Sequence, residues 1–238
     1  MTQRKVWSAM TFVKICGVSD PVTARAAAAF GADFVGVVFA PSKRQVTLGQ
    51  AGRIAEGLGQ REPVSHDAGA AEIEAALGRR RPLLVGVFAD QDADTINDIA
   101  DGCGLDLVQL SGSEPWELNE HIRRPILKCL KLRPEEKAED LMTHVHGNAI
   151  VLLDPYVEGA YGGTGVTLDW TVAAEVARQT PTVLAGGLTP TNVGEAVRDV
   201  QPWGVDVSSG VETDGAKDPA KIRAFIAAAK AERDVRSA

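Results

Sequence analysis

The 238-residue sequence is poor in cysteine and in basic stretches, and it contains no long apolar run. The three cysteines, Cys16, Cys103 and Cys129, are odd in number and form no CxxC pair. This pattern argues against a disulfide framework or a zinc site and is typical of a reducing compartment, so we expect a cytoplasmic protein. No apolar stretch of about 18 residues and no signal-peptide pattern is found, so we expect no membrane segment.

Positive charge is scarce as well. Lys and Arg number 25 against 32 Asp and Glu, which gives a net charge of -7, and Arg79-Arg80-Arg81 is only a short cluster. This balance disfavours nucleic acid and membrane surfaces as partners. An anionic small molecule would need a local positive site in a negative chain.

Eight short apolar runs alternate with longer amphipathic segments. Runs with little polar alternation are typical of parallel strands that are buried on both faces. The predicted strands are Thr11–Cys16, Asp33–Phe39, Leu83–Phe88, Leu105–Leu110, Ile126–Leu130, Ala149–Asp154, Thr182–Ala185 and Gly204–Ser208.

The intervening segments predict helices, several of which have a proline near the first turn, where its missing N–H has no cost. They are Asp20–Phe30, Leu48–Leu58, Asp92–Asp101, Glu114–Arg123, Pro134–His144, Leu168–Gln179, Pro190–Val200 and Asp218–Ala229. Eight alternating pairs in a chain of this length predict an α/β fold, a single (β/α)8 TIM barrel over residues 1–238. Two small domains or a doubly wound open sheet are the alternatives, although no GxGxxG follows the first strand. The long stretch 59–81 predicts an external helix at Ala70–Leu77.

Polar residues stand at the ends of several predicted strands, where active sites lie in this fold. Side chains alternate between the two faces of a strand, so Lys14 and Cys16 share one face, as do Ile150, Leu152 and Asp154. Strands one and eight are neighbours in a closed barrel, so we predict a buried ion pair between Lys14 and Asp206. Alone, such a cysteine is often a small buried hydrophobe and such an aspartate a cap, but together they favour a reactive site.

Glycines follow the last two predicted strands. Gly186-Gly187 precedes a helix, and Ser208-Ser209-Gly210 follows strand eight. The loops after strands seven and eight are the usual phosphate site of these barrels, because backbone N–H groups can approach an anion there. Ordinary turns are the alternative. Arg44, after strand two, is suited to binding a carboxylate, or is a solvated surface charge.

The motifs together resemble the phosphoribosylanthranilate isomerase family of tryptophan biosynthesis. The resemblance extends from about Thr11 to about Ala228. The residues that carry it are VKICG at 13–17, SKR at 42–44, VGVF at 85–88, VQL at 108–110, LLD at 152–154, GGTG at 162–165 with DW at 169–170, AGGLTP at 185–190 with NV at 192–193, and VDVSSGVE at 205–212.

The resemblance implies an Amadori rearrangement of N-(5-phosphoribosyl)anthranilate to 1-(2-carboxyphenylamino)-1-deoxyribulose 5-phosphate, the third step of tryptophan synthesis from chorismate. It implies that Cys16 is the general base, Asp154 the general acid and Arg44 the ligand of the anthranilate carboxylate. Phosphate is expected at Gly186, Gly187, Ser208, Ser209 and Gly210. Further substrate contacts are expected from Lys14, Gln109, Ser111, Gly163 and Gly165, without a metal or an organic cofactor.

Two departures from the family pattern are visible. Ser111 stands where the family usually has histidine, and the segment before Ser42 is one residue shorter than usual. Two other functions therefore remain open: a related sugar-phosphate isomerase with another substrate, or a non-catalytic phosphosugar-binding barrel. The small-molecule partner is expected to be phosphorylated, and a monomer and a homodimer are both compatible with the sequence.

Overall fold

The computed structural model of the protein describes residues 11–59, 64–156 and 168–234, and it confirms the (β/α)8 barrel. The strand order is closed, from β1 through β8 and back to β1. All eight predicted strands are present, with ends that differ from the predicted ends by no more than two residues. They are β1 (Phe12–Cys16), β2 (Phe34–Val38), β3 (Leu83–Phe88), β4 (Leu107–Leu110), β5 (Ile126–Leu132), β6 (Ile150–Pro155), β7 (Thr182–Leu184) and β8 (Gly204–Val207).

Helices follow most strands, and the helices predicted after β4 and β5 are wrong in type or length. The α-helices are α1 (Pro21–Ala29), α2 (Leu48–Gly57), α3 (Ala70–Arg79), α4 (Ala93–Cys103), α5 (Ala138–Met142), α6 (Trp170–Ala177), α7 (Val193–Val200) and α8 (Pro219–Asp234). The segment predicted as a helix at Glu114–Arg123 contains only the 3-10 helix η1 (Trp116–His121), and α5 covers only part of Pro134–His144. A second 3-10 helix, η2 (Ser209–Val211), leads into the hairpin of β9 (Glu212–Thr213) and β10 (Ala216–Lys217).

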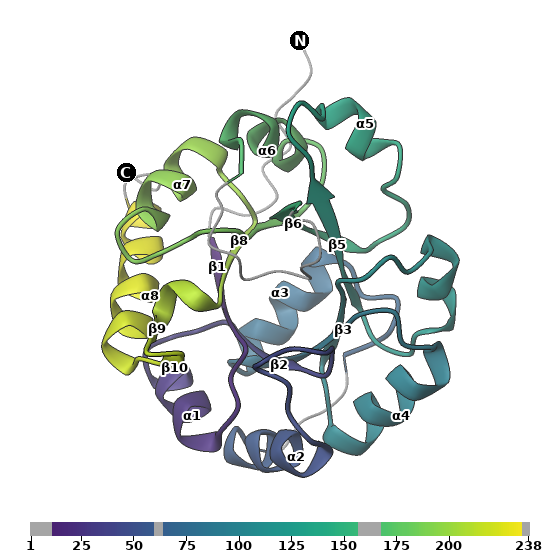
Figure 1. Ribbon diagram of the computed structural model, residues 1–238, viewed down its shortest axis with the longest axis vertical. Coiled ribbons are helices and arrows are strands. Elements are labelled where there is room, and N and C mark those ends of the chain that lie inside the picture. Colours follow the sequence, from purple (N-terminus) through teal and green to yellow (C-terminus); the bar gives the residue numbers. More distant parts are fainter. Residues whose placement is uncertain (1–10, 60–63, 157–167, 235–238) are drawn as a thin grey trace. The chain divides into compact units, whose positions relative to one another are not determined.

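The chain forms two compact units. The β1–β5 unit comprises Lys14–Cys129 and His146–Ala149. The β6–β8 unit comprises Leu130–Val145 and the described residues of Met1–Val13 and Ile150–Ala238. In the first, α1 packs beside α2 and α2 beside α4; in the second, α6 packs beside α7 and α7 beside α8 (Figure 1).

The apolar runs form strands because both of their faces are covered. Every residue of β1, β2, β3 and β4 is buried. Polar residues begin the helices that follow: the Asp20 carboxylate accepts the N–H of Thr23 at 2.9 Å, and Thr47 forms a capping box with Gln50. These caps satisfy N–H groups that a helix leaves without partners in its first turn.

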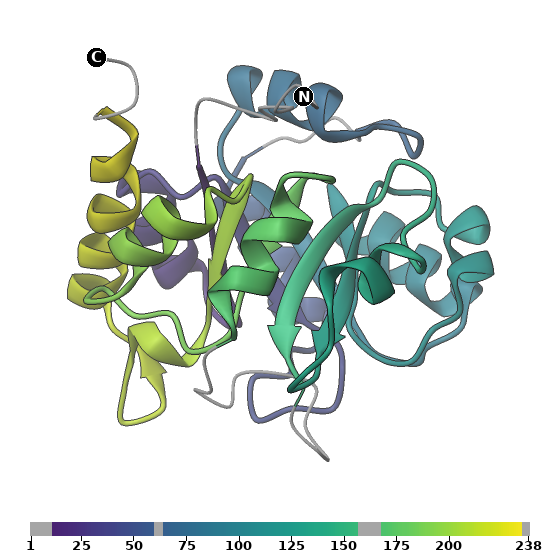
Figure 2. The same cartoon turned by 90° about the horizontal axis from the view of Figure 1, so that it is seen from above.

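Helix α3 confirms the predicted additional helix in the long stretch 59–81. The two arginines that follow it form ion pairs with buried aspartates. Arg80 Nη2 lies 2.5 Å from Oδ1 of Asp106, just before β4, and Arg81 Nη1 lies 2.7 Å from Oδ1 of Asp33, just before β2. The other Asp106 oxygen accepts the N–H of Leu84 at 2.7 Å. The short basic cluster therefore neutralises buried carboxylates at the amino ends of strands. Figure 2 shows α3 (blue) on that side of its unit.

Replacing Asp106 with alanine should destabilise the fold. The carboxylate is fully buried, and its loss leaves the Leu84 N–H and the Arg80 guanidinium with a missing partner. We expect the free energy of unfolding in urea to fall by about 3 kcal/mol. Asp98→Ala, on the exposed side of α4, is the control and should change it little. Equal stability of the two variants would contradict a supporting role for Asp106.

Candidate functional site

Cys16 and Lys14 lie on the same face of β1, as predicted, and Gly36 makes room for both. Cys16 pairs with Gly36 on the neighbouring strand β2. A Cβ atom on Gly36 would lie 3.1 Å from the sulfur of Cys16 and 3.1 Å from Nζ of Lys14. The thiol and the ammonium group therefore flank one point on the sheet. Gly36 was missed from the sequence, and its pairing with Cys16 is the signal that identifies it.

The surroundings of Cys16 act in two directions on its ionisation. Cys16 belongs to a buried apolar cluster with Val38, Ala40, Val87 and Ala89, which favours the neutral thiol. The nearby Lys14 ammonium favours the thiolate. Lys14 is only 1% exposed, so water screens this charge weakly.

Gln109 and Ser111 lie on the same face as Cys16. The strand register carries that face across the sheet, because Val38 pairs with Val87 and Val87 pairs with Gln109. Gln109 Nε2 donates to Ser111 Oγ at 2.9 Å, and both side chains are buried. Among the described residues, Oε1 of Gln109 has no hydrogen-bond partner. A buried acceptor of this kind is suited to a ligand donor or a water molecule.

Glu114 and Lys128 support this end of β4 from the opposite face of the sheet. The two Glu114 carboxylate oxygens serve different groups: Oε1 accepts the N–H groups of Asp90 and Gly112, and Oε2 lies 3.5 Å from Nζ of Lys128. Lys128 also donates to the Glu114 carbonyl at 2.5 Å. Burial lowers the pKa of Lys128, and the Glu114 carboxylate opposes that shift. These contacts fix the loop that follows Ser111.

Arg44 is half-buried after β2, in the loop that leads to α2. Its N–H donates to Ser42 Oγ at 3.1 Å, and the next residue, Gln45, forms a bridge with Val38. Gln45 Nε2 also donates to the Phe39 carbonyl at 3.1 Å. The backbone that follows Arg44 is therefore held against β2.

Asp154, at the end of β6, forms an ion pair with a residue that the sequence did not identify. Lys131 Nζ lies 2.7 Å from Oδ2 of Asp154, and the two side chains are 20% and 10% exposed. Lys131 belongs to β5, which continues two residues beyond its predicted end. The extension places this ammonium group on the face of Asp154.

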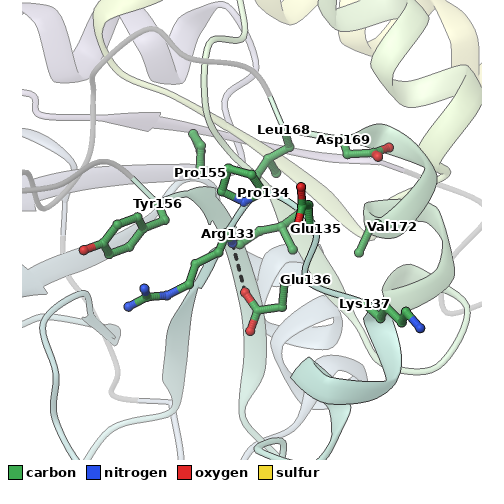
Figure 3. A pocket seen from close by; sticks show the side chains of 11 residues that line it. Arg133, Pro134, Glu135, Glu136, Lys137, Pro155, Tyr156, Leu168, Asp169 and Val172 are labelled. Carbon is green, nitrogen blue, oxygen red and sulfur yellow. Dashed lines mark hydrogen bonds between the residues drawn. The ribbon is translucent and has the colours of Figure 1, made fainter.

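A cavity of about 500 Å³ lies beside the same strand ends but on their other face. Leu132 and Pro155 line it, together with Pro134, Leu168 and Val172 (Figure 3). Each strand alternates its side chains, so Lys131 and Asp154 point away from this cavity. Arg133 covers the ring of Tyr156 at 4.1 Å beside it. The cavity is therefore separate from the ion pair.

The glycine turns after β7 and β8 meet. A Cβ atom on Gly210 would overlap the carbonyl oxygen of Leu188, so only glycine permits this approach. Gly186 and Gly187 have φ of 85° and 61°, a conformation that glycine adopts without strain. Asn192 secures the first turn, because its side chain donates to the Gly187 carbonyl at 3.1 Å and accepts the Thr189 N–H at 2.7 Å. The predicted start of α7 at Pro190 is wrong, since these contacts delay the helix to Val193.

Lys217 brings a buried positive charge to the turn after β8. Its Nζ donates to the Ser208 carbonyl at 2.9 Å and to Ser208 Oγ at 3.3 Å, and it pairs with Glu212 at 2.8 Å. The β9–β10 hairpin, in which Lys217 pairs with Glu212, returns Lys217 to this position. The sequence did not identify Lys217, because nothing in the pattern predicts the hairpin.

Not every sequence prediction is tested. Gly163 and Gly165 lie outside the described residues. The Lys14–Asp206 ion pair stays a prediction; the side chains of Lys14 and Asp206 are both buried. The single-domain organisation also stays a prediction. All three cysteines are buried.

The closed parallel barrel, with ionisable side chains at the carboxyl ends of its strands, defines a (β/α)8-barrel enzyme. Residues 56–228 match the family model described as N-(5'phosphoribosyl)anthranilate (PRA) isomerase. The chain belongs to this family.

Individual relatives agree with the family match. The N-(5'-phosphoribosyl)anthranilate isomerase of Roseiflexus castenholzii is 48% identical over 222 residues, which cover 92% of this chain and 98% of the relative. The crystal structure of phosphoribosyl anthranilate isomerase from Thermotoga maritima has a TM-score of 0.77 at 34% identity, with 92% and 98% of the two chains covered. Another structure of this isomerase, in complex with reduced 1-(o-carboxyphenylamino)-1-deoxyribulose 5-phosphate, has a TM-score of 0.72 at 33% identity, with the same coverage of both chains.

Within the described ranges, none of the helices combines the length and the apolar character that a bilayer crossing requires.

Gly210→Ala should strain the contact between the two glycine turns. The added methyl group has to displace the Leu188 backbone or the turn itself. We expect a loss of about 1–3 kcal/mol in the free energy of unfolding, as for other overpacked sites. The control is Gly102→Ala in α4. An added Cβ atom has no neighbour within 4 Å there, so this substitution should stabilise the helix. Unchanged stability of Gly210→Ala would show that the turns do not meet.

Proposed function

We propose that this chain catalyses the Amadori rearrangement of N-(5'-phosphoribosyl)anthranilate in tryptophan biosynthesis. The product is 1-(2-carboxyphenylamino)-1-deoxyribulose 5-phosphate. The observation that carries the proposal is the family membership over most of the chain, joined to ionisable groups at the ends of β1 and β6. The related isomerase structure with a reduced form of this product supports the same reaction.

Asp154 is the general acid in this proposal. Opening the furanose ring requires a proton on the ring oxygen, and a carboxylic acid can supply it. The O–H bond of the acid breaks, the ring C–O bond breaks, and the anthranilate nitrogen forms a Schiff base with C1 of the sugar. Asp154 is left as a carboxylate.

Cys16 is the general base. The Schiff base makes the C2 hydrogen of the sugar acidic, so that a thiolate can remove it and leave an enolamine. The enolamine then becomes the ketone, as C1 gains a proton and the C2 hydroxyl group loses one. The Lys14 ammonium, on the same side of β1 as the sulfur, supports the thiolate in its apolar surroundings. All of these steps use protons only, so the proposal includes no metal or organic cofactor.

The remaining predicted residues hold the substrate. Phosphate binds at the two glycine turns, at Gly186, Gly187 and the segment 208–210, where the buried charge of Lys217 adds to the backbone N–H groups. Arg44 binds the anthranilate carboxylate with its forked guanidinium group.

Gln109 and Ser111 accept a hydrogen bond from a hydroxyl or N–H group of the substrate, and the Oε1 atom of Gln109, which has no partner among the described residues, supports this assignment. Ser111 keeps Gln109 oriented through their hydrogen bond, which gives the serine a use although it cannot replace the imidazole that the family usually has. Gly163 and Gly165 are proposed to cover the substrate.

The proposed partner is therefore a phosphorylated small molecule and not a nucleic acid, in a cytoplasmic setting. One of the similar solved structures is described as monomers generated from a dimeric phosphoribosylanthranilate isomerase. Both a monomer and a homodimer are compatible with the proposed reaction, because all of the proposed residues belong to one chain.

Cys16→Ala and Asp154→Ala should each lower turnover by about 10³-fold or more, because each removes one half of the proton transfer. The labile substrate is generated in situ, and the loss of anthranilate fluorescence is followed. Cys103→Ala is the matched control: burial raises the pKa of this thiol, and the residue lies in α4. Circular dichroism confirms that each variant is folded. Turnover close to that of the wild type in either of the first two variants would refute its assigned role.

A further inference from the structure

The ion pair between Lys131 and Asp154 has no place in the proton transfers proposed for the reaction. It connects neighbouring strands at their carboxyl ends, and its N–O distance of 2.7 Å is that of a charge-assisted hydrogen bond. Both groups are mostly shielded from water, since the Lys131 side chain is 20% exposed and that of Asp154 is 10% exposed. Such a pair is screened much less than a surface ion pair.

The strand geometry makes this contact specific. Lys131 is the next-to-last residue of β5, and Asp154 is the next-to-last residue of β6. Their successors, Leu132 and Pro155, line the cavity on the other face of the strands. The backbone is fixed on that side, because the Tyr156 N–H donates to the Leu132 carbonyl at 2.8 Å. The side chains of Lys131 and Asp154 therefore meet on the face opposite the cavity, without a loop to move them apart.

The proposed reaction creates a need for this charge. When Asp154 gives its proton to the ring oxygen, a negative charge forms on a largely buried carboxyl group. Burying such a charge is costly unless a partner compensates it. Lys131 is already within hydrogen-bond distance and needs no reorganisation when the proton leaves.

We propose that Lys131 is the positioning residue of Asp154: it fixes the carboxyl group and supplies the positive charge that balances the carboxylate left by proton transfer. The proposal rests on the proposed function, in which Asp154 is the acid. It assigns no direct contact with substrate to Lys131. The carboxyl proton moves to the ring oxygen and is later replaced from solvent, while Lys131 keeps its own proton throughout.

The other charged groups named near β6 in its own unit have different partners, are exposed, or are themselves anionic. In the loop after β5, Arg133 lies over Tyr156 and Glu136 accepts the Arg133 N–H, while Glu135 and Lys137 are exposed. At the start of α6, Asp169 caps the helix through the Thr171 N–H. Strand β7 has no charged residue, and β8 contributes the buried Asp206. Lys131 is therefore the cation that the described contacts of this unit assign to Asp154.

Lys131→Met tests the proposal, because methionine keeps the length of the side chain and removes its charge. An opposite charge this close lowers the pKa of a carboxyl group by about one to three units. In Lys131→Met, the limb of the pH profile of kcat/KM that reports Asp154 should therefore move to higher pH by about one to three units. The limb that reports Cys16 should not move. Lys131→Arg keeps the charge and should retain both limbs.

Direct titration of the Asp154 carboxyl group by ¹³C NMR provides a second readout that does not depend on turnover. The titration midpoint should be higher in Lys131→Met than in the wild type, by the same one to three units. Lys137→Met, which removes an exposed lysine of the same segment, is the matched control and should leave both readouts unchanged. Should the methionine variant not fold, Lys131→Gln replaces it.

A variant that loses activity while both pH limbs and the NMR midpoint stay fixed would overturn the proposal, because Lys131 would then serve the fold alone. A different result would contradict the proposed function: normal turnover in an Asp154→Asn variant, which has no carboxylic acid to donate a proton. A shifted NMR midpoint together with an active Asp154→Asn variant would keep the ion pair and reject Asp154 as the acid.

Discussion

The chemistry of this protein depends on one constraint: its strands are covered on both faces, so a polar side chain within them must find a partner or stand at a strand end. Every residue of β1 to β4 and of β6 is buried. The interior therefore carries few charges, and each is costly without compensation. Ionisable groups collect at the carboxyl ends, where Cys16 and Asp154 stand. The same constraint makes the alternation of faces along each strand a reliable guide to which side chains can meet.

Charge compensation is the second theme. The chain has a net charge of -7, yet three lysines on β5 and β10 are largely shielded from water and paired with carboxylates. Lys128 pairs with Glu114, Lys131 with Asp154 and Lys217 with Glu212, each within one compact unit. Each pair joins segments that are adjacent in the fold, so it fixes geometry as well as charge. A site for an anionic substrate can thus exist in an acidic protein without an exposed basic patch.

The sequence predicted the strands well, because a short, continuous apolar run is what a parallel strand buried on both faces requires. The helices after β4 and β5 were predicted poorly. The Glu114 carboxylate accepts the N–H groups of Asp90 and Gly112, and this tertiary contact replaces the predicted first turn of a helix. Lys131 was missed for a simple reason: the predicted strand ended at Leu130, which placed this lysine in a loop. The position of Lys217 depends on the pairing of two two-residue strands, which no apolar pattern in the sequence predicts.

The arginines after α3 give the long connection between β2 and β3 a structural role. Arg80 and Arg81 neutralise the carboxylates of Asp106 and Asp33, which precede β4 and β2, the two strands on either side of β3. The connection therefore stabilises the amino ends of β2 and β4 and does not merely join two strands. A shortened chain made for crystallography or for grafting would have to retain α3, because its Ile73, Ala76 and Leu77 are buried. It would have to keep both guanidinium groups in register, or replace both aspartates with neutral residues at the same time.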